Sequence, residues 1–387
     1  MFRFIKSFKR FALCGLLAGI LAGAPGAFGQ EWRTLSGESR NSREAFQKIA
    51  DLMPSYSVSA LAAAVIQDGK IVFICHSGQF DRPRGVRVDE KTVFRAASLS
   101  KPVFAYLTLR LADEGRIGLD RPLEQILGKP LESFPDYRDL SADARQKRLT
   151  PRLLLSHQGG LPNWRRMTQN RLIFLADPGQ RFGYSGEGYY LMQFVLETLT
   201  GVPLDRLARK YVFLPLGLEE TSYLWEPRFD GRFAVDLATG LRPLIERTRT
   251  KANAAGSLIT RAEDYARFLQ AAMNGENLKP ETAKAMRTPQ TVITGPIIGP
   301  SRPEAAASTP PAGLSWALGW GRLPSPAGEA FFHIGQEDGC ENYAVFFPEK
   351  RTGLVLLTVC GEKIGIASEV SRYLIGDLYS PFSWMGY

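Results

Sequence analysis

Residues 93–123, VFRAASLSKPVFAYLTLRLADEGRIGLDRPL, are the most informative segment for the fold and contain the first candidate for chemistry. Its pattern predicts a helix over residues 98–114 that ends at Gly115, a residue favoured just past a helix C-terminus. Pro102 fits this helix because it falls in the first turn. One face of the helix is apolar and carries Val103, Phe104, Leu107 and Leu111. A buried helix that begins with an otherwise exposed serine and lysine suits a nucleophile in a cleft.

Strands are expected at both ends of the chain and helices in its middle. Asp68-Gly69 separates two apolar runs, 58–67 and 70–76, and is a strong two-residue hairpin signal. Further strands are predicted over residues 316–321, 331–335, 342–347 and 353–360. Further helices are predicted over residues 42–53, 188–200, 204–211, 261–274 and 363–379, and one more begins at Thr150-Pro151. The simplest assembly is an α+β fold, in which an antiparallel β-sheet flanked by helices adjoins a mainly helical lobe and the site lies between the two.

The last two predicted strands form a hairpin around residues 348–352. Pairing Phe347 with Leu354 brings Cys340 and Cys360 nearly opposite each other. Such a pair forms either a disulfide or two adjacent buried thiols, and the geometry of neighbouring strands often resists bridging.

The N-terminus has the layout of a secretory signal peptide. Four basic residues precede an apolar run over residues 11–24, and Ala27-Phe28-Gly29 supplies a small-residue cleavage pattern. The run is shorter than the ~20 residues of a spanning helix, which favours cleavage over an uncleaved membrane anchor. We therefore expect a signal peptide over residues 1–29, a loose polar lead-in over 30–43 and one folded domain over 44–387.

Composition excludes several classes of protein. The chain has 387 residues, 44% hydrophobic and 22% charged, which indicates an ordinary globular protein and not a disordered or coiled-coil one. Four cysteines are too few for a disulfide scaffold, and three histidines without paired spacing predict no zinc site. The net charge is +9, and four of these positive charges belong to the leader. Because no basic stripe interleaved with aromatics is present, we expect no nucleic-acid partner.

Ser98 and Lys101 are a candidate nucleophile and base. Their spacing puts both side chains on one face of the predicted helix, one turn apart. The N–H groups at a helix N-terminus favour negative charge at Ser98, and they and partial burial would lower the pKa of Lys101 so that it accepts the serine proton. A Ser-x-x-Lys occurs about once by chance in a chain of this length, so the assignment depends on its context.

Two further segments have the composition of a site. Tyr184-Ser185-Gly186 follows a run rich in proline, glycine and aromatics, and the tyrosine hydroxyl can relay a proton. His333-Ile334-Gly335-Gln336 lies on a predicted strand, where an interior glycine indicates close approach of a ligand or another backbone. The N–H that follows this glycine can help to hold an oxyanion. Taken alone, Tyr184 would be interpreted as a tyrosine that only packs. The alternative interpretation of Gly335 is an ordinary bulge glycine beside a surface histidine.

The ordered combination of the three segments resembles the serine β-lactamase and penicillin-binding-protein superfamily. It is most similar to the branch with class C β-lactamases, DD-carboxypeptidases, D-aminopeptidases and family VIII-type esterases. The resemblance runs from Phe46 to Leu378 and includes LTPRLLLSHQGGLP (149–162), FLPLGLEETS (213–222) and AAGSLITRAEDYARFL (254–269). It implies a β-lactamase/transpeptidase-like fold and a serine acyl hydrolase, with no metal or organic cofactor.

The resemblance also implies a role for each matching residue. Ser98 matches the acylated nucleophile, Lys101 the proton acceptor beside it, and Tyr184 the tyrosine that shares the proton transfer. The backbone N–H groups of Ser98 and Gln336 match the oxyanion hole. Gly335 matches the glycine that lets substrate lie along the strand.

Departures from the family pattern bear on the substrate. Gly186 replaces an asparagine that holds the acylamino group of penicillins and peptides. His333 replaces a charged lysine and Ile334 a threonine that helps to bind a carboxylate, and the histidine can be neutral at pH 7. Because these changes remove recognition but leave the acylation machinery, we expect hydrolysis of an ester or a small D-amino-acid amide or peptide. The alternatives are a β-lactamase or DD-carboxypeptidase, and a penicillin- or cell-wall-binding sensor that does not turn over.

A Ser-His-Asp hydrolase would need Gly-x-Ser-x-Gly, and the nearest string, Gly183 to Glu187, lacks the last glycine. His157 is expected to be a structural histidine of its loop, and Glu187 has no assigned role.

Together with the leader, the resemblance implies an exported bacterial enzyme, periplasmic or secreted, without a membrane span after cleavage. Its substrate would be a small molecule or a peptidoglycan-like compound, and the proline-rich segment 287–312 would form the rim of the site.

Overall fold

The structure is a computed structural model that describes residues 29–81, 84–141, 143–235, 243–296, 308–361 and 365–386. All of the predicted signal peptide except Gly29 lies outside the described residues, as does the centre of the segment 287–312. Within the described ranges, no helix is both long enough and apolar enough to cross a membrane.

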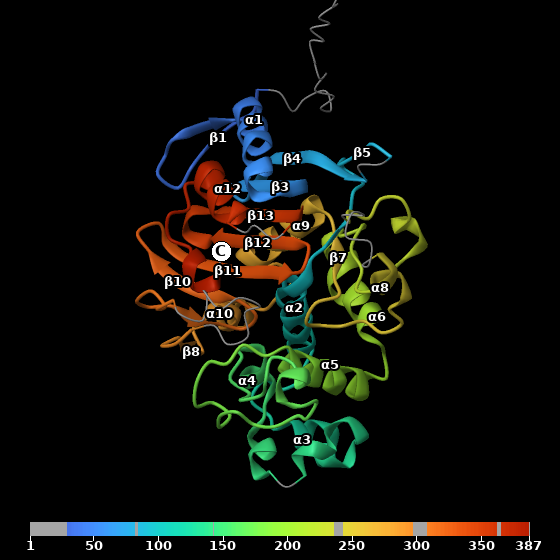
Figure 1. Cartoon of the computed structure of the whole chain (residues 1–387). Coiled ribbons are helices and arrows are strands. Elements are labelled where there is room, and N and C mark those ends of the chain that lie inside the picture. The colour runs from blue at the N-terminus through green and yellow to red at the C-terminus, as the bar shows by residue number, and fades with distance from the viewer. Residues whose placement is uncertain are drawn as a thin grey trace, which may run out of the picture.

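The expected α+β architecture is confirmed. In the described part of the chain, nine strands form one antiparallel sheet in the order β5-β4-β3-β13-β12-β11-β10-β9-β8. Figure 1 shows the blue strands from the N-terminal part of the chain beside the red and orange strands from the C-terminal part. The strands are β3 (Val58–Gln67), β4 (Lys70–Asp81), β5 (Val86–Arg87), β8 (Thr291–Val292), β9 (Ser315–Trp316), β10 (Gly321–Ser325), β11 (Gly328–Glu337), β12 (Cys340–Phe347) and β13 (Thr352–Cys360).

The central strand β3 contributes to two cores, one on each face of the sheet. From Ala60 to Ile66, its even-numbered residues pack with α2 (Ser100–Asp113) and α9 (Ala262–Asn274), and its odd-numbered residues with α1 (Ser42–Leu52) and α12 (Ile366–Ile375). Because helices cover both faces, residues 60–66 of β3 form an unbroken apolar run and do not alternate with polar residues.

A mainly helical lobe adjoins the sheet, below it in Figure 1, and α2 runs between the two. Its helices are α3 (Leu123–Leu127), α4 (Pro151–Leu155), α5 (Gly186–Thr200), α6 (Leu204–Ala208) and α7 (Leu214–Leu216). The expected cap of α4 is present, since the Thr150 hydroxyl accepts from the Leu153 N–H at 3.3 Å. The remaining elements are β1 (Glu31–Arg33), β2 (Ser39–Asn41), β6 (Phe94–Arg95), β7 (Ile259–Thr260), α8 (Pro243–Thr248), α10 (Pro280–Arg287) and α13 (Phe382–Met385).

The prediction of a loose lead-in over residues 30–43 is wrong. Strands β1 and β2 pair in this segment, and Trp32 between them is 2% exposed. The Trp32 ring stacks on Phe73 at 4.8 Å, and its Nε1–H donates to the Leu374 carbonyl at 2.8 Å. One buried aromatic therefore orders a segment whose other residues are mostly polar.

The predicted hairpin register is also wrong, by two residues. Phe347 pairs with Thr352, and Pro348–Lys350 forms a 3-10 turn between the strands. Cys340 pairs instead with Glu337 of β11, and Cys360 with Val58 of β3. Cys340 and Cys360 are both buried, and no disulfide joins them.

Candidate functional site

Ser98 lies in a 3-10 turn, Ala97–Leu99, that leads into α2, so the helix itself starts two residues later than predicted. Ala97 has a φ of +49°, a left-handed conformation that costs energy in a residue with a side chain. Neighbouring contacts hold the turn in place: the Ser100 hydroxyl donates to the Ala97 carbonyl at 2.6 Å and accepts from the Leu258 N–H at 2.9 Å. The turn leaves Ser98 partly exposed while the residues around it are buried.

Lys101 reaches Ser98 as its spacing predicted. Its Nζ donates to the Ser98 Oγ at 3.0 Å and to the Ala255 carbonyl at 2.8 Å. The side chain is fully buried, and this burial lowers its pKa to about 7, an effect that the charge of Glu337 partly opposes. A lysine with this pKa is substantially neutral near pH 7 and can accept the Ser98 proton.

Tyr184 lies beside the same pair, just before the N-terminus of α5. Its ring centroid is 4.8 Å from the Lys101 Nζ. Burial raises the pKa of the phenol, and its interaction with the Ser98 hydroxyl opposes that shift only in part. The Tyr184 hydroxyl makes no hydrogen bond of ordinary geometry with the described residues. Because its pKa is raised, the hydroxyl stays protonated at neutral pH. Because it has no acceptor among the described residues, it can donate to a group that enters the site.

His157 fixes the loop that carries Tyr184. Its Nδ1 accepts from the Ser185 N–H at 3.1 Å, and its carbonyl accepts from the Gly183 N–H at 2.8 Å. The imidazole centroid is 4.3 Å from that of Tyr184. Burial, with the nearby Lys101 charge, holds the pKa of His157 well below its usual range. His157 is thus a neutral structural residue in this geometry.

Ser185 does not have the surroundings of a nucleophile. Its Oγ donates to the Pro162 carbonyl at 2.8 Å and accepts from the Gly188 N–H at 2.9 Å, which makes it the N-cap of α5. The Ser-His-Asp interpretation of the Gly183–Glu187 string therefore has no support in the geometry.

The strand β11 brings Gly335 against the nucleophile turn. A Cβ on Gly335 would lie 2.3 Å from the Ala96 carbonyl oxygen, so glycine is required here by the approach of the protein's own backbone. Strand β10 pairs only with residues 328–332 of β11, whereas β12 pairs with residues 331–337. The segment from His333 to Gln336 thus has one edge free of β10, and its backbone is available to a substrate or oxyanion on that side.

His333 is fully buried next to Tyr184, with 6.1 Å between the ring centroids. Its Nδ1–H donates to the Ile334 carbonyl at 2.7 Å, which leaves Nε2 as an acceptor without a partner among the described residues. Burial, with the nearby Lys101 charge, lowers its pKa to about 3. His333 is therefore uncharged at neutral pH and provides no cation for a substrate carboxylate.

Gly186 begins α5 and is held by a segment that the sequence analysis did not single out. Its N–H donates to the Asn163 Oδ1 at 2.9 Å, and the ring of Trp164 occupies the space that a Cβ at this position would fill. The same ring is 5.9 Å from the Lys101 Nζ. The sequence offered one signal for this contact with Trp164. A glycine at the start of a helix has no side chain, and it leaves space that a neighbouring residue can fill. Glu187 has a structural role, since its carboxylate pairs with Arg165 at 2.8 Å.

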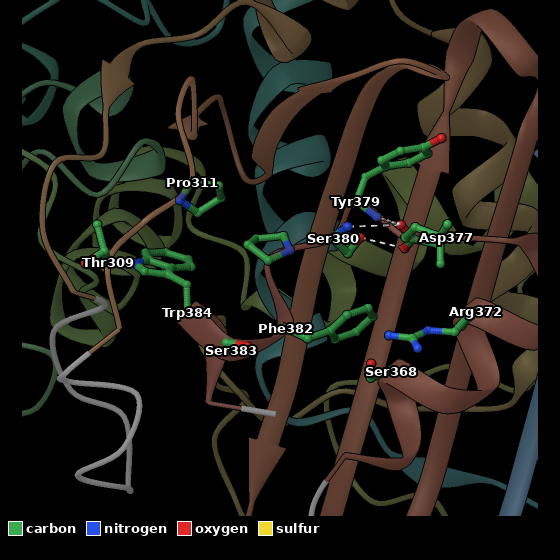
Figure 2. A pocket seen from close by; sticks show the side chains of 12 residues that line it. Thr309, Pro311, Ser368, Arg372, Asp377, Tyr379, Ser380, Phe382, Ser383 and Trp384 are labelled. Carbon is green, nitrogen blue, oxygen red and sulfur yellow. Dashed lines mark hydrogen bonds between the residues drawn. The ribbon is translucent and has the colours of Figure 1, made fainter.

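A pocket of about 370 Å³ lies at the C-terminal segment, and Ser98 is not among its lining residues. Figure 2 shows Asp377 accepting from Tyr379 and Ser380, so this carboxylate already has partners. Trp384 lines the pocket, and its ring centroid lies 6.2 Å from that of Phe182, which in turn packs on His157. Among the described residues, no cluster of His, Cys, Asp or Glu is arranged to hold a metal ion.

Comparison with known proteins identifies the relatives of this chain. A family model described as Beta-lactamase matches residues 45–367. Penicillin-binding protein 4 of Amycolatopsis lactamdurans is 24% identical over 348 residues, which cover 84% of this chain and 87% of that protein. Esterase EstB of Burkholderia gladioli is 28% identical over 208 residues, 46% of this chain and half of the esterase.

A solved structure agrees with the fold. The D-alanine carboxypeptidase AmpC from Burkholderia cenocepacia superposes with a TM-score of 0.66 at 18% identity. The superposition covers 87% of this chain and 99% of that protein. At this identity the likeness is evidence for the shared architecture alone.

Proposed function

Because the chain belongs to the beta-lactamase family and is a serine acyl hydrolase, we propose that it hydrolyses esters or small D-amino-acid amides or peptides through an acyl-Ser98 intermediate. One observation carries the proposal: the Lys101 Nζ lies 3.0 Å from the Ser98 Oγ, and burial lowers the lysine pKa to about 7. A hydroxyl so close to a neutral amine is an activated nucleophile.

The proposed reaction has two halves. Neutral Lys101 takes the Ser98 proton as the Oγ attacks the carbonyl carbon, and the N–H groups of Ser98 and Gln336 stabilise the oxyanion. Tyr184 donates its proton to the departing alkoxide or amine as the bond to the acyl carbon breaks, and protonated Lys101 passes the Ser98 proton on to Tyr184. Water then attacks the acyl-Ser98 ester, and Lys101, with Tyr184 beside it, accepts a proton from this water. The proton passes to the Ser98 Oγ as its bond to the acyl carbon breaks, and the carboxylic acid is released.

The proposed substrate class follows from the charge of the site. His333 is uncharged at neutral pH, and Ile334 offers no hydroxyl, so neither side chain would attract a substrate carboxylate. Gly186 presents no amide to an acylamino group. These features support an ester or a small amide over a β-lactam. Similar enzymes recognise a β-lactam through its carboxylate and its acylamino group.

A DD-carboxypeptidase or β-lactamase is the second candidate. It is favoured by one observation, the match to penicillin-binding protein 4 over 84% of this chain. A penicillin-binding sensor without turnover would share the same acylation step.

We further propose that the enzyme is exported to the periplasm or secreted, since residues 1–29 have the layout of a signal peptide. We also propose that it acts on a small or peptidoglycan-like substrate without a nucleic-acid partner.

Steady-state kinetics test the proposal. The mature protein and its Ser98→Ala variant would be assayed with p-nitrophenyl acetate, a D-alanine p-nitroanilide, a penicillin and a cephalosporin. We expect turnover of the ester or the amide that is lost in Ser98→Ala, with β-lactam hydrolysis far slower. High turnover of cephalosporins with little ester hydrolysis would favour the second candidate and contradict the proposed substrate class.

A further inference from the structure

The space that a side chain at position 186 would fill is occupied by another residue. A Cβ on Gly186 would lie 2.5 Å from Cζ3 and 2.6 Å from Cη2 of Trp164. Real Cβ atoms do not approach other atoms this closely, so the indole and a side chain at 186 exclude each other. Trp164 thus stands where the family pattern has a polar side chain.

Hydrogen bonds on both sides hold Trp164 in this position. The preceding residue, Asn163, accepts the Gly186 N–H on both its carbonyl and its Oδ1 and accepts the Glu187 N–H on its carbonyl. In the following residue, Arg165, the backbone N–H and the Nε each donate to the Glu187 carboxylate, at 3.0 and 2.8 Å. Both neighbours of Trp164 are therefore attached to the first turn of α5. An aromatic side chain anchored in this way keeps its orientation when substrate binds.

The indole also lies close to the reacting groups. Its ring is 5.9 Å from the Lys101 Nζ, which is itself bonded to the Ser98 Oγ. The ring packs on Tyr190 with 5.7 Å between centroids, and it is only half-buried. Trp164 thus offers apolar surface next to the lysine that contacts the Ser98 Oγ, the atom to which an acyl group would become attached.

We propose that Trp164 is the specificity-determining wall of the acyl subsite and selects esters whose acyl group is an unsubstituted apolar chain. This inference rests on the proposed function and deepens it. The Ser98 Oγ–acyl bond forms as the ester C–O bond breaks, the alcohol leaves with the proton, and water then releases the carboxylic acid. In the acyl-enzyme, the chain packs on the indole. An α-acylamino substituent would lose water there without gaining the amide partner that a polar side chain at 186 would provide.

The test uses three esters with the same leaving group: p-nitrophenyl acetate, butyrate and N-acetylglycinate. In the Trp164→Ala variant we expect the ratio of kcat/KM for butyrate over acetate to fall about tenfold. The ratio for N-acetylglycinate over butyrate should rise in the same variant. Trp164→Phe keeps an aromatic ring at this position, and its butyrate-over-acetate ratio should fall only about threefold. This variant replaces Trp164→Ala in the test if the alanine variant does not fold. Trp225→Ala is the matched control, because that half-buried tryptophan packs on Phe229 and Phe233 in a separate cluster.

A second pair of variants tests the exclusion directly. Gly186→Asn alone should lower the melting temperature, because its Cβ meets the indole. The double variant Trp164→Ala/Gly186→Asn should recover the melting temperature and turn over N-acetylglycinate in preference to butyrate.

Two results would overturn the inference: unchanged ester ratios in both folded Trp164 variants, or a wild-type preference for N-acetylglycinate. Either could occur while Ser98-dependent ester hydrolysis continues, in which case the proposed function stands. Absence of any Ser98-dependent turnover in the wild type would instead remove the proposed function, and this inference with it.

Discussion

At the scale of single residues, Lys101 carries a cost to stability that can be measured. Its pKa is about 7 in the folded protein against an ordinary value of 10.5, so between these values the unfolded chain binds more protons. Folding stability therefore rises with pH across this window. The burial penalty is complete below pH 7 and disappears above pH 10.5.

Replacing Lys101 with methionine should remove this dependence. Relative to Lys101→Met, the wild type should gain about 2 kcal/mol of unfolding free energy between pH 7 and pH 9. Urea denaturation at both pH values measures the gain, and Lys70→Met, at an exposed lysine, is the control. An equal difference between wild type and Lys101→Met at both pH values would show that Lys101 keeps an ordinary pKa.

The sequence was sufficient to predict some site contacts and not others. The approach of Lys101 to Ser98 is local, because residues three apart on a turn or helix share a face. The contacts of Trp164 with Gly186 and of His157 with Tyr184 join segments more than 20 residues apart, and no periodicity encodes them. His333 was predicted to be capable of neutrality, but its depressed pKa follows from a burial that only the folded sheet produces.

At the scale of elements, the contact between β11 and the nucleophile turn depends on one glycine. A methyl group on Gly335 would meet the Ala96 carbonyl oxygen at 2.3 Å and Leu99 Cγ at 3.0 Å. Gly335→Ala should therefore push the strand away from the turn, destabilise the fold by about 2 kcal/mol and lower kcat. Denaturant titration and ester kinetics measure the two effects.

Gly295→Ala is the matched control, because an added methyl group meets nothing within 4 Å at that position. If Gly335→Ala were as stable and as active as this control, the strand would not be held against the turn as described.

Element types were easier to predict than their junctions. The hairpin signal at Asp68-Gly69 predicted the turn and its register, because a two-residue turn permits few registers. The bounds of β3 are as predicted, whereas β4 continues to Asp81, beyond the predicted end at residue 76. The turn after Phe347 has no such signal, and a shift of two residues keeps the same side chains on each face. Hydrophobic patterning therefore could not distinguish the predicted register from the observed one.

At the scale of the whole molecule, the two ends of the chain are held together by more than the sheet. Trp32 lies between Phe73 of β4 and the Leu374 carbonyl of α12, so it joins the N-terminal segment to both. Trp32→Ala should lower the unfolding free energy by about 3 kcal/mol without changing the ester selectivity of the folded protein. Leu214→Ala, at a side chain 64% exposed, should change stability by less than about 0.5 kcal/mol. A Trp32→Ala variant as stable as Leu214→Ala would mean that the N-terminal hairpin contributes nothing to the fold.

The sheet and the helical lobe meet at Ser98, which we propose becomes acylated. Acylation is measured by intact-protein mass spectrometry after rapid acid quench of the enzyme with p-nitrophenyl acetate, followed by peptide mapping. We expect a gain of one acetyl group on the peptide that contains Ser98, present in the wild type and in the exposed-site control Ser133→Ala, and absent in Ser98→Ala. An acetyl group that persists in Ser98→Ala, or release of nitrophenol by the wild type with no adduct on Ser98, would mean that Ser98 is not the nucleophile.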